Sequence, residues 1–567
     1  MKKQVLRRWA WLGAALMTGA MYALIGLALE MRYAMNDDTF MLRTFMGYEG
    51  SIPSFHLLLH GLLCWPLKLL GESYPGVAWF SIFQIAFLAF ACVLTVKSLI
   101  QCFVNRGRSF WLGVAFGAVF LAAFYLEICT QVTFTCTAAA LGAAAVLQLM
   151  SIDWEDARPA QVLGGILLAL VPAVLAYALR QEAIFPVLGF CALALGYGLV
   201  CRRPSRGALR AAAAGVLTVA VVLGSLALWR SAEEKANAEF VRWSRARSDL
   251  IDYYALNDLS PEILEQAGWD ENTVKMAKRF CFLNPAMTTE SMETLLAYEQ
   301  AQPRENRVET GAALAASTLL GNERFRLTVE VAAWVLLGCM AALALGGGSR
   351  RGWQWTALAL NIGLFAACLL YLGVRGRLPL RAVRMAMLPL TAALFGMLPN
   401  LLPPKRTGRV VGLCCLALCV AWTGWYTVQT APGLLPDENY EMEVGNPAAT
   451  LDEYALSEPE MLFIYDDSLI SDARMFPDVS EGIPTNVAFW GGWGFRSESS
   501  YRQFAAYEID LDEMDAEMWL REDICLASAV LDPPPRLMLS YLQEQVDSEV
   551  DYNLYGEDGG VYFFQFY

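Results

Sequence analysis

The chain has 567 residues, of which 56% are hydrophobic and only 17% are charged, and its mean hydropathy is +0.39. This composition excludes an ordinary soluble protein, because the apolar residues come in separate runs of roughly 20, the length that spans a bilayer as a helix. The net charge is −14, but residues 431–567 hold 29 acidic residues and five Arg, a net of −24, so the rest carries +10 (−14 minus −24). Such an acidic segment is a poor partner for nucleic acid.

Eleven apolar runs predict membrane-spanning helices. The basic segment Met1–Trp9 precedes the first run, which predicts an uncleaved first helix and a cytoplasmic N-terminus. Basic residues such as Arg206, Arg351 and Arg406 then fall on the cytoplasmic side, and the odd number of spans leaves the C-terminus extracytoplasmic. We therefore predict a multi-pass protein of the plasma membrane. The runs are Trp9–Leu29, Val77–Val96, Phe110–Leu126, Thr133–Met150, Val162–Ala178, Ile184–Val200, Ala211–Trp229, Leu327–Leu345, Trp353–Gly373, Val383–Leu401 and Val410–Val428.

The predicted architecture is a transmembrane domain over residues 1–430 and an acidic extracytoplasmic α/β domain over 431–567. Two outer loops interrupt the spans, at 30–76 and 230–326. In the first loop, the apolar stretch Phe55–Leu70 is predicted to lie on the outer surface, because a span there would place the basic stretch Lys97–Arg108 outside. Helices are predicted at Pro261–Gln266, Thr289–Gln302 and Leu537–Gln545, and strands at Met461–Tyr465, Asn486–Trp490 and Val561–Phe566.

Two adjacent carboxylates, Asp37 and Asp38, follow the first span in the sequence Asn36-Asp37-Asp38. A carboxylate that is partly desolvated at the outer end of a membrane helix can act as a general base toward an acceptor hydroxyl or amine. The alternative is a solvated polar cap, with Asp38 as the N-cap of a helix over Thr39–Tyr48. A divalent cation between the two carboxylates is a further alternative.

Arginines gather at the predicted outer ends of the spans, against the usual sign preference for that side. Arg375, Arg377, Arg381 and Arg384 crowd one outer loop, and Arg180 with Glu182 ends another span. Guanidinium groups pair bidentately with phosphate oxygens, so the cluster is a candidate phosphate site. Pairing with the acidic segment or with lipid headgroups is the alternative.

Four other features are candidates for substrate contact or packing. His56 and His60 have the i, i+4 spacing of one helical face, and substrate contact or interfacial packing is favoured over a metal site because no zincin motif accompanies them. Arg247 and Asp249 open the large loop. Trp490-Gly491-Gly492-Trp493-Gly494 predicts a tight turn after a strand, with indole rings that stack on a sugar or pack. Cys281 and Cys525 are the two cysteines placed wholly outside, and they are candidates for one disulfide.

The first hundred residues resemble the type C glycosyltransferases, in particular the branch of the protein mannosyltransferases and aminoarabinose transferases. The resemblance lies in the cytoplasmic N-terminus, the single span, the Asp-Asp loop, the spacing Gly47 to Pro53, and a short apolar helix ending Leu69-Leu70-Gly71. It covers Trp9–Arg108 by motif and the later spans by topology. Where members commonly have Pro-Pro-Leu, this chain has Pro53-Ser54-Phe55. The chain also resembles bacterial polytopic membrane proteins with an Asn-Asp-Asp first outer loop.

The resemblance implies an inverting glycosyltransferase that moves a sugar from a polyprenyl-phosphate donor to an extracytoplasmic glycan, lipid or protein. Asp37 or Asp38 would serve as the base, and Arg180, Arg375, Arg377 and Arg381 would neutralise the leaving phosphate, with no cofactor. A transporter of lipid-linked saccharides would carry ionisable groups in mid-membrane, and the predicted spans hold few. A non-catalytic sensor or assembly protein built around the acidic domain is the other alternative.

Overall fold

The computed structural model describes residues 2–202, 204–254, 256, 259–302, 307–321, 323–346, 350–403, 405–430, 447–469 and 474–567. The first part of the predicted acidic domain, residues 431–446, lies outside the described residues. The chain forms two compact units. The helical unit contains Met1–Arg32, Phe83–Trp229 and Glu305–Pro436, and the mixed unit contains Tyr33–Ile82, Arg230–Arg304 and Asp437–Tyr567.

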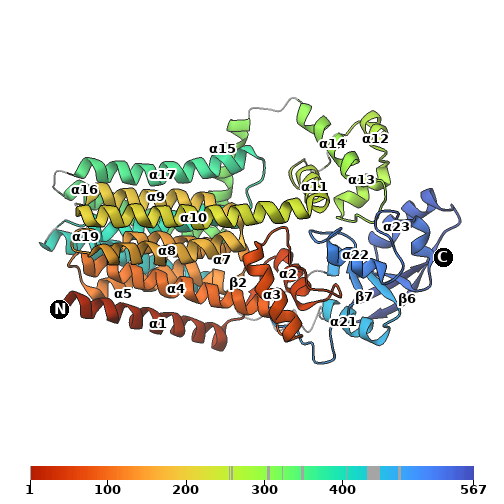
Figure 1. Ribbon diagram of the computed structural model, residues 1–567, viewed down its shortest axis with the longest axis horizontal. Helices are drawn as coiled ribbons and strands as arrows, with labels where there is room; N and C mark the ends of the chain where they lie inside the picture. The colour runs from red at the N-terminus through yellow and green to blue at the C-terminus, as the bar shows by residue number, and fades with distance from the viewer. Residues whose placement is uncertain are drawn as a thin grey trace. The chain divides into compact units, whose positions relative to one another are not determined.

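Long apolar helices build the helical unit, and the axes of most of them are roughly parallel (Figure 1). Among the described residues, ten helices are long and apolar enough to cross a membrane, and each overlaps one of the predicted spans. The polytopic helical fold predicted from the sequence is therefore confirmed. These ten are α1 (Lys2–Ala28), α4 (Trp79–Asn105), α5 (Phe110–Phe120) continued by the π-helical turn Leu121–Tyr125 and α6 (Leu126–Thr130), α8 (Pro159–Leu179), α9 (Ile184–Cys201), α10 (Arg206–Ala236), α16 (Glu323–Leu345), α17 (Arg351–Val374), α18 (Leu380–Leu401) and α19 (Lys405–Thr430). Two shorter helices of this part of the chain are α7 (Phe134–Met150) and α15 (Arg307–Gly321).

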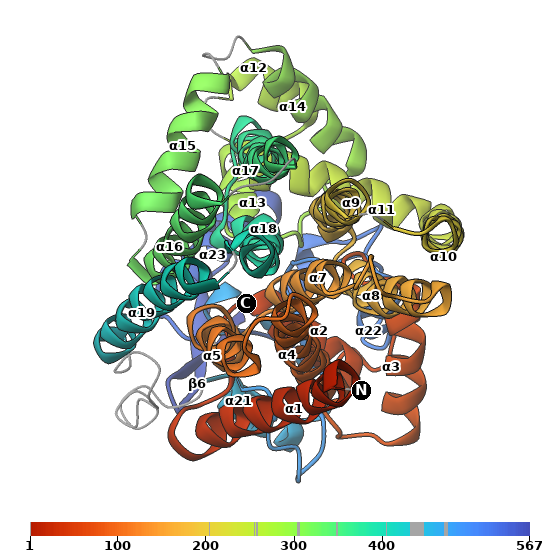
Figure 2. The same cartoon turned by 90° about the vertical axis from the view of Figure 1, so that its left-hand side faces the viewer.

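Helix α7 is the centre of the helical unit. All 17 of its residues are buried, and it packs against α8, α9 and α18, as the view along the bundle shows (Figure 2). Six alanines and Gly142 lie in the middle of its sequence, so neighbouring helices approach closely, and a Cβ at Gly142 would collide with Val187. At about 25 Å long, α7 is shorter than the ten other apolar helices, although its sequence was predicted as a span like theirs.

An ion-pair network at one end of the helical unit explains an anomaly of the sequence. The turn Asp153–Arg158, which connects two predicted spans, holds three acidic residues and one basic residue, Arg158. Arg7 of α1 pairs with Asp153 at 2.6 Å. Arg106 and Arg202 each lie 3.7 Å from Glu155. Basic residues from three other segments therefore neutralise this acidic turn.

The mixed unit is built on a five-stranded sheet of order β4-β3-β5-β7-β6. β3 pairs in parallel with β4 and β5, whereas β7 pairs antiparallel with β5 and β6. The predicted strands and the three predicted helices all form, at bounds that differ by a few residues. The strands are β3 (Leu462–Tyr465), β4 (Val487–Phe489), β5 (Ile524–Ser528), β6 (Tyr552–Asp558) and β7 (Val561–Phe566). The helices are α2 (Asn36–Met46), α3 (Gly61–Ser73), α11 (Ala238–Arg247), α12 (Pro261–Ala267), α13 (Glu271–Lys278), α14 (Thr289–Ala301), α21 (Pro447–Ser457), α22 (Glu498–Ala505) and α23 (Pro534–Gln545). Outside this sheet there are two strands of two residues, β1 (Arg32–Tyr33) at the boundary of the unit and β2 (Gln131–Val132) in the helical unit.

Alternation along β3 divides the core of the mixed unit between the two faces of the sheet. Leu462 and Ile464 belong to a large cluster that includes Trp243, Phe282 and other apolar residues of the segment 230–304. Phe463 and Tyr465 point to a smaller cluster with Leu451 of α21. The segment 230–304 and the C-terminal sheet therefore share one hydrophobic core, which would expose its apolar side chains if either part were missing.

The cysteines form no disulfide. All 14 are free, and the candidates Cys281 and Cys525 are both buried in the mixed unit. Cys525 lies within β5, and the backbone of Cys281 forms an isolated antiparallel β-bridge with that of Gly491. The disulfide considered from the sequence is therefore absent.

Candidate functional site

The two adjacent carboxylates lie in the first turn of α2, where an acidic side chain is favoured by the helix dipole. The helix begins at Asn36, with Met35 as its N-cap, so the predicted N-cap role of Asp38 is wrong. Successive helical residues point about 100° apart, and the two carboxylates accordingly have different surroundings. Asp38 is fully buried, whereas Asp37 is half-buried and lines a pocket. The alternative of two solvated carboxylates therefore fails for Asp38.

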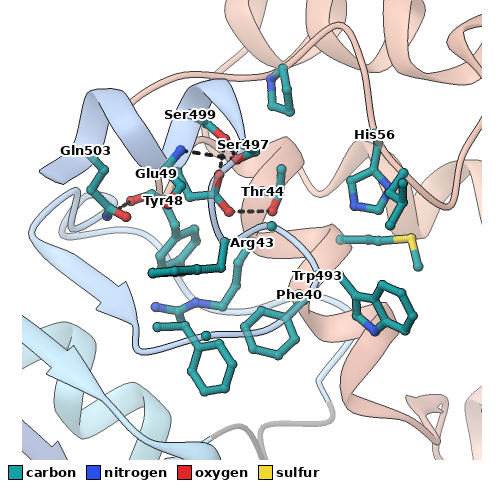
Figure 3. Close-up of a pocket in the computed structure, with 18 of the residues that line it drawn as sticks. Phe40, Arg43, Thr44, Tyr48, Glu49, His56, Trp493, Ser497, Ser499 and Gln503 are labelled. Atoms are coloured by element: carbon teal, nitrogen blue, oxygen red, sulfur yellow. Dashed lines mark hydrogen bonds between the residues drawn. The ribbon is translucent and has the colours of Figure 1, made fainter. Parts of the chain in front are cut away.

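The pocket lies wholly within the mixed unit and encloses about 840 Å³ of empty space, including the part open to solvent (Figure 3). Its walls come from α2, from the segment 48–58, and from the segment 487–504 of the C-terminal domain. Aromatic rings and hydroxyl or carboxyl groups dominate the lining. The aromatic members are Phe40, Tyr48, Phe55, Phe240, Tyr465, Phe489, Trp493, Phe495 and Phe504, and the polar members are Asp37, Arg43, Thr44, Glu49, His56, Ser497, Ser499, Ser500 and Gln503.

Glu49 is the centre of the polar wall. Its carboxylate accepts a hydrogen bond from the Thr44 hydroxyl at 2.8 Å and another from the Ser499 hydroxyl. Ser499 is in turn 3.0 Å from the Ser497 hydroxyl at the start of α22. Burial raises the pKa of Glu49, although the hydrogen bonds from Ser499 and Thr44 oppose this effect. The result is a connected row of hydroxyl and carboxyl groups along one side of the pocket (Figure 3).

Arg43 is the one Lys or Arg among the described residues that line the pocket. Its two terminal nitrogens donate to both oxygens of Asp452, at 3.0 and 2.8 Å. Its guanidinium lies over the Tyr48 ring, 3.9 Å from the centroid. The charge of Asp452 keeps the pKa of Arg43 above its ordinary value despite burial. The ion pair with Asp452 therefore fixes the Arg43 side chain, which in turn packs against Tyr48 in the pocket wall.

Trp493 links Asp37 to a buried arginine. The indole Nε1 donates to the Asp37 carboxylate at 3.1 Å. The Arg247 guanidinium, at 1% exposure, lies 4.4 Å from the Trp493 ring centroid. The two glycines that precede Trp493 permit this turn: Gly491 approaches the backbone of Phe280 where no Cβ would fit, and Gly492 has φ of +85°. Trp493 thus fixes the orientation of Asp37 in the pocket.

The histidines do not share a helical face, because residues 54–60 form no helix and α3 begins only at Gly61. His60 is the buried N-cap of α3, with Nδ1 accepting from the Leu62 amide at 2.9 Å. His56 lines the pocket, and burial followed by the charge of Arg230 lowers its pKa to about 3. His56 is therefore neutral at physiological pH.

The other candidate residues belong to the helical unit or lie away from the pocket. Arg180 ends α8, pairs with Glu182 at 2.9 Å and lies over the Phe134 ring. Arg375, Arg377 and Arg381 occupy the α17–α18 connection and the first turn of α18. Arg384, three residues further along α18, pairs with Glu127 at 2.6 Å. In the mixed unit, Asp249 follows Arg247 in the π-helical turn Ser248–Tyr253 and is not a lining residue.

Sequence reasoning missed the residues that surround Asp37. Arg43, Glu49, Ser499 and Gln503 were not singled out, because ordinary surface positions of a helix carry the same residue types. One signal was available: the glycines before Trp493 marked a turn that needs special backbone geometry.

Of the comparisons with known proteins, the one with solved structures gives matches. No family model matches the sequence, and no curated protein matches it. Two of the similar solved structures are crystal structures of ArnT from Cupriavidus metallidurans, one in the apo state and one bound to undecaprenyl phosphate. Each is 12% identical in sequence, with a TM-score of 0.41 and 97% of both chains covered.

Proposed function

We propose that this protein transfers a sugar from a polyprenyl-phosphate donor to an extracytoplasmic acceptor, with Asp37 as the general base. The observation that carries this proposal is the position of Asp37, which lines an aromatic and hydroxyl-rich pocket and is oriented by Trp493. Asp37 follows the end of α1 at Ala28 by nine residues, and nine residues reach at most ~30 Å. This short connection to the first apolar helix is consistent with a donor that is linked to a membrane lipid.

The proposed reaction is an inverting displacement. The acceptor hydroxyl gives its proton to the Asp37 carboxylate while its oxygen attacks the anomeric carbon of the sugar. The bond between that carbon and the phosphate oxygen breaks, and polyprenyl phosphate leaves. Arg375, Arg377 and Arg381, with Arg180, are the proposed cations that neutralise the leaving phosphate. Asp37 and Asp38 face different surroundings, which supports a single base in place of a carboxylate pair.

Sugar transfer in reconstituted membranes tests this proposal. Purified protein is given a panel of polyprenyl-phosphate sugars, with and without EDTA, and wild type is compared with Asp37→Asn. We expect Asp37→Asn to lower kcat by about 10²- to 10⁴-fold, the usual contribution of a general base. The control is Asp478→Asn, because Asp478 is an exposed carboxylate outside the pocket lining that accepts local hydrogen bonds from Ser480. Full activity of Asp37→Asn would remove Asp37 from the mechanism, and the absence of transfer from every donor would reject the enzyme.

A second pair of variants separates positioning from folding. Trp493→Phe keeps an aromatic ring but removes the N–H that binds Asp37, so we expect a lower kcat with little change in KM. Asp38→Asn changes a fully buried carboxylate, so we expect it to lower the melting temperature as well as activity. An unchanged kcat in Trp493→Phe would show that the hydrogen bond to Asp37 has no part in turnover.

A further inference from the structure

The charges in the pocket are unfavourable for an anion. Asp37 and Glu49 are the acidic groups of the lining, and Arg43 is its one described Lys or Arg. Both terminal nitrogens of Arg43 are held by Asp452. A bound phosphate would therefore have carboxylates nearby and a guanidinium already engaged in a bidentate pair. The molecule that fills this pocket is expected to carry no negative charge.

The aromatic side of the pocket offers flat apolar faces. Phe40 and Phe489 form a tilted pair with centroids 4.7 Å apart, and Trp493 has its N–H fixed by Asp37. Arg43 holds Tyr48 from one side of its ring. Figure 3 shows Phe40 and Trp493 along the same side of the pocket. Rings held in this way can pack against the C–H face of a sugar while leaving its hydroxyls free to hydrogen-bond.

The polar side offers several donors and acceptors in a row. Glu49, Ser497 and Ser499 are linked by hydrogen bonds, and the two serine hydroxyls can rotate to accept or donate. Gln503 fixes this wall, since its side-chain nitrogen donates to the carbonyls of Thr485 and Val487, each at 3.0 Å. A hydrocarbon chain against this wall would remove water from Glu49 and offer no hydrogen bonds in its place, which is unfavourable. A molecule with several hydroxyl groups would satisfy the same wall.

We propose that the pocket binds an uncharged glycan, whose sugar ring lies against Phe40 and Trp493 and whose hydroxyls meet Glu49 and Ser499. This inference rests on the proposed function in one respect, namely that the glycan is the acceptor and presents a hydroxyl to Asp37. The glycan identity itself follows from the pocket lining and can be tested without any transfer reaction.

Binding is measured by calorimetry on the full-length protein in nanodiscs. The probes are neutral trisaccharides of glucose, mannose, galactose and N-acetylglucosamine, with trigalacturonate and inorganic phosphate as anionic comparators. We expect at least one neutral trisaccharide to bind, and both anionic probes to bind at least tenfold more weakly. Phe40→Leu keeps an apolar side chain but loses the flat ring, and Ser499→Ala removes one hydroxyl. Each is expected to weaken binding about tenfold. Tyr555→Ala is the matched control, since Tyr555 is an exposed ring on β6 outside the pocket.

Each result decides the proposal. No binding by any neutral trisaccharide overturns it, as does tighter binding of trigalacturonate or phosphate. Binding that Tyr555→Ala weakens as much as Phe40→Leu also overturns it, because the ligand would then lie elsewhere. Glycan binding without sugar transfer from any donor would reject the proposed enzyme while the glycan site stands. Transfer to a lipid or peptide acceptor without glycan binding would reject the glycan site while the enzyme stands.

Discussion

Single residues in the mixed unit show how neighbouring carboxylates acquire different properties. Asp466 follows β3 directly and is fully buried, accepting hydrogen bonds from the hydroxyls of Ser468 and Ser528. Burial raises the pKa of Asp466 to about 6, although these hydrogen bonds oppose the effect. Asp467, one residue further on, lies 3.7 Å from Arg279 and is far more exposed. Asp466 is therefore a group whose ionisation opposes folding at neutral pH.

Replacing Asp466 by Asn should change how stability depends on pH. Because the folded pKa is raised, the contribution of Asp466 to stability is complete below the unfolded pKa, 3.8, and is lost as pH rises through about 6. The loss amounts to about 3 kcal/mol, from a shift of about two pKa units. We expect the melting temperature of Asp466→Asn, relative to wild type, to rise between pH 4 and pH 7. Thermal melts of the full chain across this range measure the difference.

The control for this measurement is Asp478→Asn. The Ser480 backbone amide lowers the pKa of the exposed Asp478, so its contribution to stability has the opposite sign and is lost as pH falls. A difference between Asp466→Asn and wild type that stays constant from pH 4 to pH 7 would contradict the prediction.

At the scale of elements, one side chain near the end of α10 holds the segment that carries His56. Arg230 donates to the carbonyls of His56 at 3.0 Å, Leu57 at 2.6 Å and Leu59 at 3.2 Å. It also pairs with Glu234 at 3.0 Å and is 4% exposed. Segment 56–59 has no regular secondary structure, so Arg230 supplies to its carbonyls the hydrogen bonds that a helix or a sheet would otherwise provide.

Arg230→Met should release this segment. The substitution keeps the apolar stem but removes the donor from three carbonyls, of which that of Leu59 is buried and those of His56 and Leu57 are partly buried. A buried carbonyl left without a donor destabilises by roughly 1–3 kcal/mol. We expect faster hydrogen exchange in peptides that cover residues 53–62, measured by mass spectrometry. The matched control is Arg242→Met, whose partners Glu290 and Glu293 are solvent-exposed and whose ion pairs contribute little. Equal exchange in both variants would show that Arg230 does not hold the segment.

Elements with a strong local pattern were predictable from the sequence, and the pocket was not. Val561–Phe566 is apolar or aromatic at every position except Gln565 and follows the turn Gly559-Gly560, and β7 has the predicted bounds. Helix α2 was placed three residues late, because Asn36 and Asp37 resemble a loop until their helical partners are known. Asp37 and Trp493 are 456 positions apart, so no local pattern could bring them together.

At the scale of the whole molecule, the sidedness of the segments remains a prediction from the distribution of basic residues. Impermeant maleimide labelling tests it, because the native cysteines outside the apolar helices are buried and give little background. A cysteine at the exposed position Ser548 should be labelled in intact cells. Ala160→Cys, at the exposed start of α8, should be labelled only after permeabilisation. Labelling of Ala160→Cys in intact cells would reverse the predicted orientation.

The shared core of the mixed unit has a consequence for how the protein is made. The three ranges that make up the mixed unit, Tyr33–Ile82, Arg230–Arg304 and Asp437–Tyr567, are separated in the chain by membrane-spanning helices. During synthesis, Trp243, Phe282 and their apolar neighbours must therefore wait until the intervening helices are inserted and β3 to β7 have emerged. Contacts between residues so far apart in the sequence form slowly. Until they form, the exposed apolar side chains are prone to aggregate. We therefore expect folding of this protein in the cell to depend on chaperones that cover the apolar surface of the incompletely folded mixed unit.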